Sequence, residues 1–199
     1  MGIPILVFVP KLQELMSRTD PESEFTRFLL FLIIPIMATT LIGITSFINE
    51  IRWKTIKPLL AAPVTEEEII LGKSLACIIT GLSVELGLAG IIFLTIKPIN
   101  SSVLMLLGVV GPLSVIFTTF VFIIGLIKLP TIADGGGAIL LPMSGFLIIF
   151  LIFIVLKGII QEDSVLIYTI LILMLLLLIG LIFSLTKKWF NRETLVLSI

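Results

Sequence analysis

Long apolar runs separated by short polar stretches make up almost the whole chain. Five of these runs are long enough to cross a hydrocarbon core, which takes about 20 helical residues, and they cover residues 28–48, 74–96, 103–127, 138–156 and 165–186. Another run, residues 2–9, is too short to span. The pattern therefore predicts an all-α polytopic membrane protein with about five transmembrane helices.

Two polar stretches stand out between these runs. Residues 11–27 are mixed in charge and predict a short loop, with a turn at Asp20-Pro21 and Ser23 as a candidate helix cap. Residues 49–73, which we call the elbow, hold about a third of the charged residues of the chain. We expect the elbow to be an ordered connector on one side of the bilayer.

The first half of the elbow has a helical period, so the preceding span should leave the membrane and continue as an amphipathic helix. Glu50 precedes Lys54 by four residues, in the favourable order for a helical ion pair. Pro58 cannot donate a backbone hydrogen bond and disfavours helical geometry at Lys57, so the chain should turn there.

The second half carries a helix-start signature. Thr65 and Glu68 form a capping box, Val64 and Ile69 are spaced for a hydrophobic staple, and the acidic residues 66–68 lie at the positive end of the helix dipole. A well-capped, solvated first turn accounts for these acids by themselves. The signature predicts a helix that runs through Gly72 straight into the second span.

Together these residues resemble the cytoplasmic signature of the type-two permeases of ATP-binding-cassette (ABC) transporters, which are the membrane subunits of ABC exporters. The match is carried by Glu50, Thr55, Pro58-Leu59-Leu60, Pro63-Val64, Glu68 and Gly72-Lys73. Two positions depart from that signature: Ile51 stands where a basic residue is common, and Lys54 replaces the usual glycine.

The resemblance implies a single transmembrane permease domain over residues 1–199, with the elbow as a cytoplasmic coupling helix. Its implied partners are ABC ATPase subunits, which bind the ATP, and a second permease subunit in a homo- or heterodimer. Coupling to the ATPase would involve Glu50, Arg52, Lys54, Thr55 and Pro63, and the rigidity of the elbow would come from Thr65 and Glu68. Members of the family have six spans, so we expect this chain to lack the first.

Composition agrees with a membrane protein and excludes several activities. The chain is 58% hydrophobic and 13% charged, against about 25% charged for soluble proteins. A net charge of zero gives no sign of nucleic-acid binding. The chain has no histidine, a single cysteine, Cys77, and no P-loop, so we expect no enzyme activity, metal or cofactor of its own.

The loop charges predict the orientation. With the elbow inside the cell, the inner loops and tail hold eight Lys and Arg residues and the outer ones five. We therefore expect a multi-pass protein of the cell membrane with a cytoplasmic C-terminus.

One ionisable residue, Glu85, lies near the middle of the second span. Such a residue costs several kcal/mol in a bilayer unless it is protonated, paired or hydrated. It either holds neighbouring helices together by hydrogen bonding or belongs to a transport path or subunit interface. Small residues around it predict a closely packed face against another subunit, formed by Gly81, Ser83, Gly87, Ala89 and Gly90.

Two other functions remain open. A non-transporting membrane assembly or immunity factor could bind its partners through the same elbow. A small secondary carrier could use Glu85 as a proton or cation site, but it should show inverted repeats and more than one buried charge. Neither feature is visible in the sequence.

Overall fold

A computed structural model describes Glu14 and residues 21–43, 66–95, 101–128, 140–160 and 164–189. Within these ranges the chain is helical and contains no strand. Five helices are long and apolar enough to span a membrane: Glu22–Gly43, Ser74–Leu94, Ser101–Gly125, Leu140–Ile159 and Ser164–Leu185. The prediction of an all-α, multi-pass membrane protein is confirmed.

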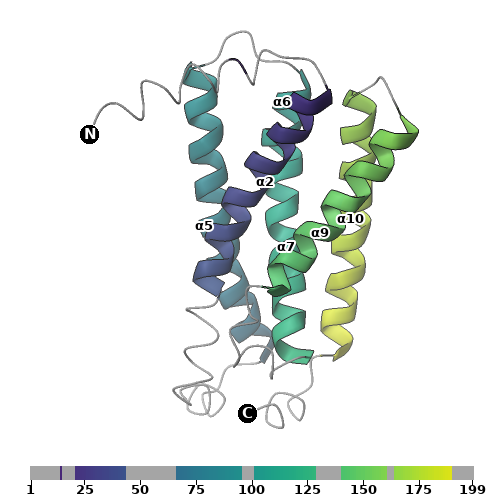
Figure 1. Cartoon of the computed structure of the whole chain (residues 1–199). Coiled ribbons are helices and arrows are strands. Elements are labelled where there is room, and N and C mark those ends of the chain that lie inside the picture. The colour runs from purple at the N-terminus through teal and green to yellow at the C-terminus, as the bar shows by residue number, and fades with distance from the viewer. Residues whose placement is uncertain are drawn as a thin grey trace.

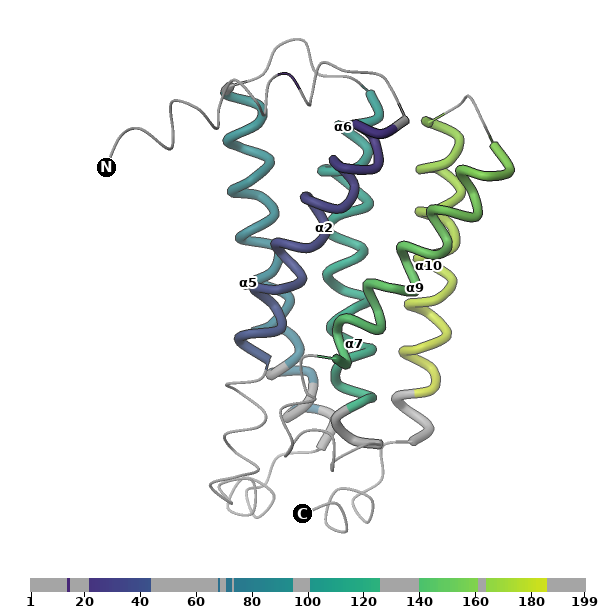
Figure 2. Tube along the Cα trace, viewed as in Figure 1, coloured from purple at the N-terminus to yellow at the C-terminus, as the bar shows by residue number. Residues whose placement is uncertain are grey.

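The helices run alternately up and down as one bundle (Figure 1). Their bounds are α2 Pro21–Gly43, α5 Glu66–Thr95, α6 Ser101–Met105, the π-helix η2 Leu106–Val110, α7 Gly111–Lys128, α9 Leu140–Ile159 and α10 Ser164–Trp189. The last residue of α2 and the first of α5 lie at one end of the bundle, together with the end of α10 (Figure 2). We call this the elbow end, and the opposite one the far end.

Helix α2 begins earlier than the sequence predicted. The polar loop was expected to reach Arg27, but the helix starts at Pro21 and Ser23 lies inside it rather than capping it. Proline is favoured in the first helical turn, where its missing N–H costs nothing, and Glu22 and Glu24 suit the positive end of the dipole. Glu24 forms an ion pair with a residue of another helix, which offsets part of the free-energy cost of burying this polar turn.

Helix α7 is the centre of the bundle, because it contacts α2, α5, α9 and α10. Close approach to α9 is made possible by Gly145, where an added Cβ would press on Thr118 of α7. In a membrane the lipid is as apolar as the side chains, so helices associate mainly through such close packing and through hydrogen bonds. Because α7 contacts four other helices, a shift of α7 would change its packing against all of them.

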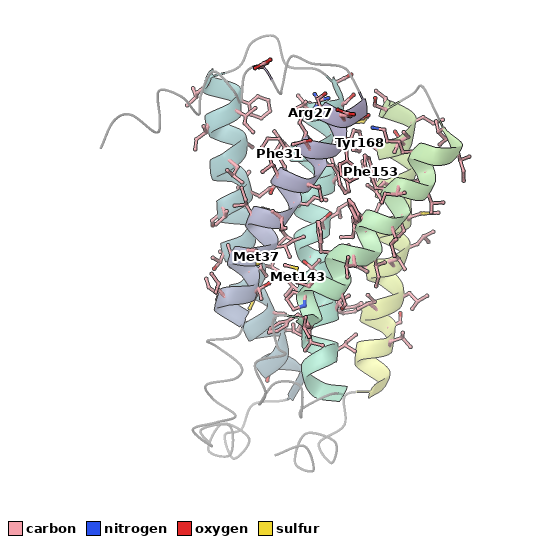
Figure 3. All side chains as sticks on the ribbon, viewed as in Figure 1. Arg27, Phe31, Met37, Met143, Phe153 and Tyr168 are labelled. Carbon is pink, nitrogen blue, oxygen red and sulfur yellow. The ribbon has the colours of Figure 1, made fainter. Side chains whose placement is uncertain are left out.

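Aromatic side chains join α2, α9 and α10 toward the far end. Phe28 of α2 stacks on Phe153 of α9, with ring centroids 3.9 Å apart and planes 7° apart. Phe153 also lies against Tyr168 of α10, with ring centroids 6.0 Å apart (Figure 3). All three rings are buried, so they form a continuous packed layer.

Outward-facing side chains on α5, α9 and α10 are large and apolar. Examples are Leu94, Val155 and Leu177, all more than half exposed. A contiguous apolar exterior of this kind suits a lipid bilayer and not water.

Replacement of Phe153 by alanine tests the aromatic layer. We expect Phe153→Ala to lower the free energy of unfolding by about 3 kcal/mol, the low end of the range for such truncations, because part of the lost transfer energy is absent in lipid. The matched control is Ile154→Ala, whose side chain is 43% exposed on the outer face. Unfolding by denaturant in lipid bicelles measures both, and equal losses would contradict the layer.

Candidate functional site

The predicted coupling residues fall mostly outside the part of the chain that the structure describes. This holds for Glu50, Arg52, Lys54, Thr55, Pro63 and Thr65. Glu68 is described and lies exposed in the first turn of α5. The helix that the capping signature predicted is present from Glu66.

Helix α5 is the element that joins the elbow to the bundle interior. It runs without a break for 30 residues, from Glu66 to Thr95, which corresponds to about 45 Å. Along this length it contacts α2, η2 and α7. One continuous helix therefore connects the elbow with the level of Glu85.

The interior carboxyl of Glu85 lies on α5 against the start of α7. Its side chain is completely buried, and neither carboxyl oxygen has a hydrogen-bond partner. The carboxyl occupies the space beside Gly111, where an added Cβ would overlap the Oε1 atom of Glu85. Glycine at position 111 is what allows a carboxyl of this size to fit between the two helices.

A π-helical turn precedes this contact. Gly111 N–H donates to the carbonyl of Leu106, five residues back, and Pro112 follows without any N–H to donate. In a regular α-helix, Pro112 would leave the carbonyl of Gly108 without a donor and its ring would clash with that carbonyl, so a widened turn relieves the crowding. The Leu107 carbonyl thus lacks both its i+4 and its i+5 donor.

The same level of the bundle contains a second interrupted helix. One turn closer to the elbow end than Glu85, α5 meets α2 and α7 at Gly81, where an added Cβ would contact Thr39 and Val115. One turn from these residues toward the far end are Glu85, Pro35 and Gly111, which therefore lie at about the same level. Since Pro35 also lacks an N–H, the Phe31 carbonyl loses its i+4 donor close to the level of Glu85.

Hydroxyl groups near this level are engaged within their own helices. Ser114 donates to the Val110 carbonyl at 2.6 Å, and Thr39 donates to the Pro35 carbonyl at 2.8 Å. Thr118 donates to the Ser114 carbonyl at 2.8 Å. Because these hydroxyl groups donate their hydrogens to backbone carbonyls, none of them donates to Glu85.

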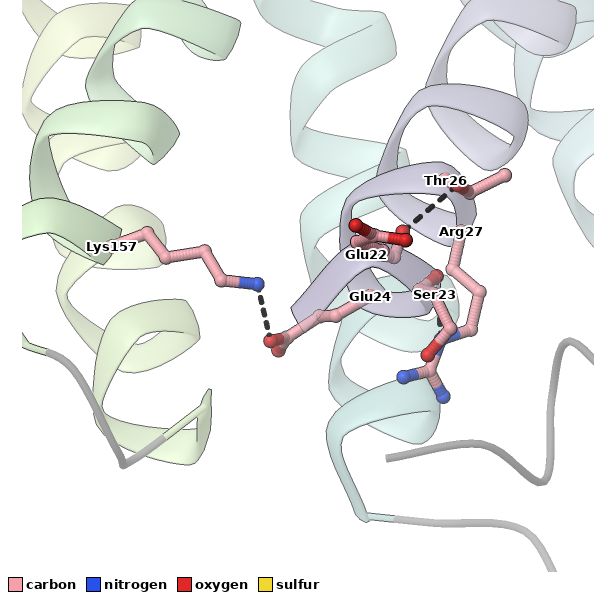
Figure 4. Close-up of polar contacts among 6 residues, drawn as sticks. All are labelled: Glu22, Ser23, Glu24, Thr26, Arg27 and Lys157. Atoms are coloured by element: carbon pink, nitrogen blue, oxygen red, sulfur yellow. Dashed lines mark hydrogen bonds and ion pairs between the residues drawn. The ribbon is translucent and has the colours of Figure 1, made fainter. Parts of the chain in front are cut away.

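A second polar cluster, at the far end, joins α2 to α9. Lys157 Nζ lies 2.8 Å from Glu24 Oε2, between side chains that are 22% and 9% exposed (Figure 4). Arg27 is buried beside this pair and donates through Nε to the Ser23 carbonyl at 3.2 Å. Tyr168 of α10 interacts electrostatically with Glu24 and Arg27.

Sequence reasoning missed this cluster, because Glu24 and Arg27 stand in a polar stretch that was predicted to be a loop. Lys157 ends an apolar run and was counted only as a loop charge. The paired residues are 133 positions apart, so no local pattern connects them. The one indication in the sequence is that these three charged residues border apolar runs whose ends are predicted to lie on the same side of the membrane.

The small residues around Glu85 do not form one face, which corrects the prediction. Gly81 and Ala89 are buried inside the bundle, whereas Ser83 and Gly87 are exposed on the opposite face of α5. At 3.6 residues per turn these positions fall on two sides of the helix. Packing against a second subunit stays a prediction for Ser83, Gly87 and Gly90, since an added Cβ on Gly90 would also meet nothing within 4 Å.

Other candidate chemistry is sparse in the described residues. Cys77 is buried and free, as a packing residue would be. No group of three or more His, Cys, Asp or Glu side chains in the described part could hold a metal ion.

Among known proteins, no family model, no curated protein and no solved structure matches the chain.

The contact between Glu85 and Gly111 can be tested by a double-mutant cycle. Gly111→Ala should destabilise the wild type, because the new methyl group displaces a buried carboxyl. In a Glu85→Ala background the same change should be neutral or stabilising, because the space is free and alanine favours the helix. We expect a coupling free energy of about 1–3 kcal/mol from unfolding in bicelles. Additive effects would show that the residues do not touch.

The ion pair at the far end gives an independent prediction. Glu24→Gln should lower the free energy of unfolding by about 1–3 kcal/mol, because it removes a charge-assisted hydrogen bond from a mostly buried site. The double exchange Glu24→Lys with Lys157→Glu should recover part of that loss. Glu22→Gln, an exposed change two residues away on the same helix, should stay within about 0.5 kcal/mol of wild type. Equal effects of Glu24→Gln and Glu22→Gln would refute the pairing.

Proposed function

We propose that this chain is the membrane-spanning permease subunit of an ATP-driven ABC export transporter, coupled to a separate ATPase subunit through the elbow. The observation that carries the proposal is the unbroken α5 helix, which begins within the coupling signature and reaches the centre of the bundle. A coupling segment needs a stiff element behind it, and α5 is one.

The proposed mechanism uses α5 as a lever. Closure of the ATPase dimer around ATP pushes on the elbow between Glu50 and Pro63. The start of α5, where the sequence carries the capping signature of Thr65 and Glu68, would pass that push into the bundle, where α5 packs on α2 and α7. Because packed helices shift between discrete arrangements, the displacement would alternate access between the two sides of the membrane.

Orientation and partners follow from the same proposal. The elbow end and the end of α10 lie on one side of the bundle (Figure 1), and this side would be cytoplasmic in the cell membrane. Energy comes from ATP bound by the partner ATPase. A second permease subunit completes the transporter, and the outer face of α5 at Ser83 and Gly87 is the proposed contact.

A small carrier that uses Glu85 is the second candidate function. It is favoured by the burial of this carboxyl without a hydrogen-bond partner. The permease ranks higher because a carrier gives no role to the elbow signature or to the α5 lever. An assembly or immunity factor would use the elbow without transport.

Co-purification tests the docking surface. The tagged full-length chain, purified in detergent with candidate ABC ATPases, should recover one of them. The double variant Glu50→Lys, Arg52→Glu should lower recovery by about tenfold or more, since like charges placed across an interface cost several kcal/mol. Glu22→Lys, an exposed reversal at the far end, serves as the matched control and should leave recovery unchanged.

The outcomes separate the candidates. Loss of the ATPase in the elbow variant alone supports a coupling surface. Failure of the wild type to recover any ATPase contradicts the permease. Recovery without any stimulation of ATP hydrolysis by the membrane subunit, in reconstituted vesicles, would favour the assembly factor.

A further inference from the structure

Glu85 has a feature that lever motion alone leaves without a role. Its carboxyl is fully buried in the middle of a membrane-spanning helix, and neither oxygen has a hydrogen-bond partner. A side chain that only filled space between α5 and α7 would be apolar, since an unsatisfied buried carboxyl costs several kcal/mol. The position therefore calls for a chemical reason.

No described counter-charge faces this carboxyl. On α2 the described charged groups are Glu22, Glu24 and Arg27, and η2 and the described side chains of α7 contribute none. Glu85 is level with Pro35, eight residues from Arg27, which is about 12 Å along the helix. On α5 the described titratable groups are Cys77, also about 12 Å away, and Glu68 near the elbow end.

Two backbone carbonyls about one helical turn from the level of Glu85 lack a helical donor. Pro112 and the π-turn leave the Leu107 carbonyl without a helical donor, and Pro35 does the same for the Phe31 carbonyl. An ionised carboxylate can only accept hydrogen bonds, whereas a protonated carboxyl carries one O–H to donate. A protonated carboxyl can donate to such carbonyls, and a carboxylate cannot.

The close contact with Gly111 favours a proton over a larger cation. The carboxyl lies directly against Gly111, without space for even a methyl group between them. A metal cation needs several oxygen ligands at distances above 2 Å, and the contact with Gly111 leaves no room for an ion on that side of the carboxyl. A proton requires no cavity.

We propose that Glu85 is a proton-binding site, in which the neutral carboxyl directs its O–H toward the carbonyls freed by Pro35 and Pro112. Release leaves a carboxylate and passes the proton to water, which requires α5 to separate from α7. If α5 is the lever of a permease, each separation exchanges one proton with one side of the membrane. That coupling rests on the proposed function, whereas the proton site does not.

Infrared spectroscopy of the full-length protein in lipid vesicles tests the site directly. At neutral pH the wild type should show the C=O stretch of a protonated carboxyl, and Glu85→Gln should remove it. Gln matches the size of the neutral carboxyl, so this variant should melt at the temperature of the wild type. Glu68→Gln, which changes an exposed carboxyl on the same helix, should leave the band intact.

Two further arms keep the assignment independent of one variant. Glu85→Asp should retain a protonated-carboxyl band at a shifted frequency, which assigns the band even if the Gln variant fails to fold. Exchange of sodium for choline should change nothing. A wild type without the band, a band that survives Glu85→Gln, or a band that sodium abolishes would each overturn the proposal. Each readout is independent of whether an ATPase co-purifies.

Discussion

The constraint behind this structure is that a bilayer offers no hydrogen-bond partners to the backbone. Every N–H and C=O within the spans must be satisfied inside the protein, and the described residues answer with helices almost throughout. Serine and threonine side chains obey the same rule by returning their hydroxyls to their own helices. Departures from the rule are therefore informative, and they gather at Pro35 and Pro112.

These two prolines give the bundle a polar level inside an apolar body. Each removes a backbone donor, and the π-turn before Pro112 shifts the hydrogen-bond register of the third span. Glu85 packs where these interruptions lie, against Gly111. The carbonyls that lose their donors at these interruptions are the acceptors proposed for the protonated carboxyl, which connects helix geometry to the chemistry proposed for this site.

Elsewhere the bundle is held by fit. The stacked rings of Phe28, Phe153 and Tyr168 join α2, α9 and α10 toward the far end, and the Glu24 pair with Lys157 closes that end. On the other side of α7, the spanning part of α5 is less buried than that of α2 or α9, and that of α10 is less buried still. Helix α5 extends toward the elbow as one unbroken helix.

The sequence alone determined the class, the spans and the start of α5, because those depend on local rules: the length needed to cross a bilayer, a capping signature and helix-breaking prolines. It also singled out Glu85, since a charge in an apolar run is conspicuous. Only the tertiary structure decided that Gly111 faces Glu85 and that Glu24 pairs with Lys157. Such contacts join residues far apart in sequence, and their geometry depends on the rotation and depth of each helix in the bundle, which no local pattern specifies.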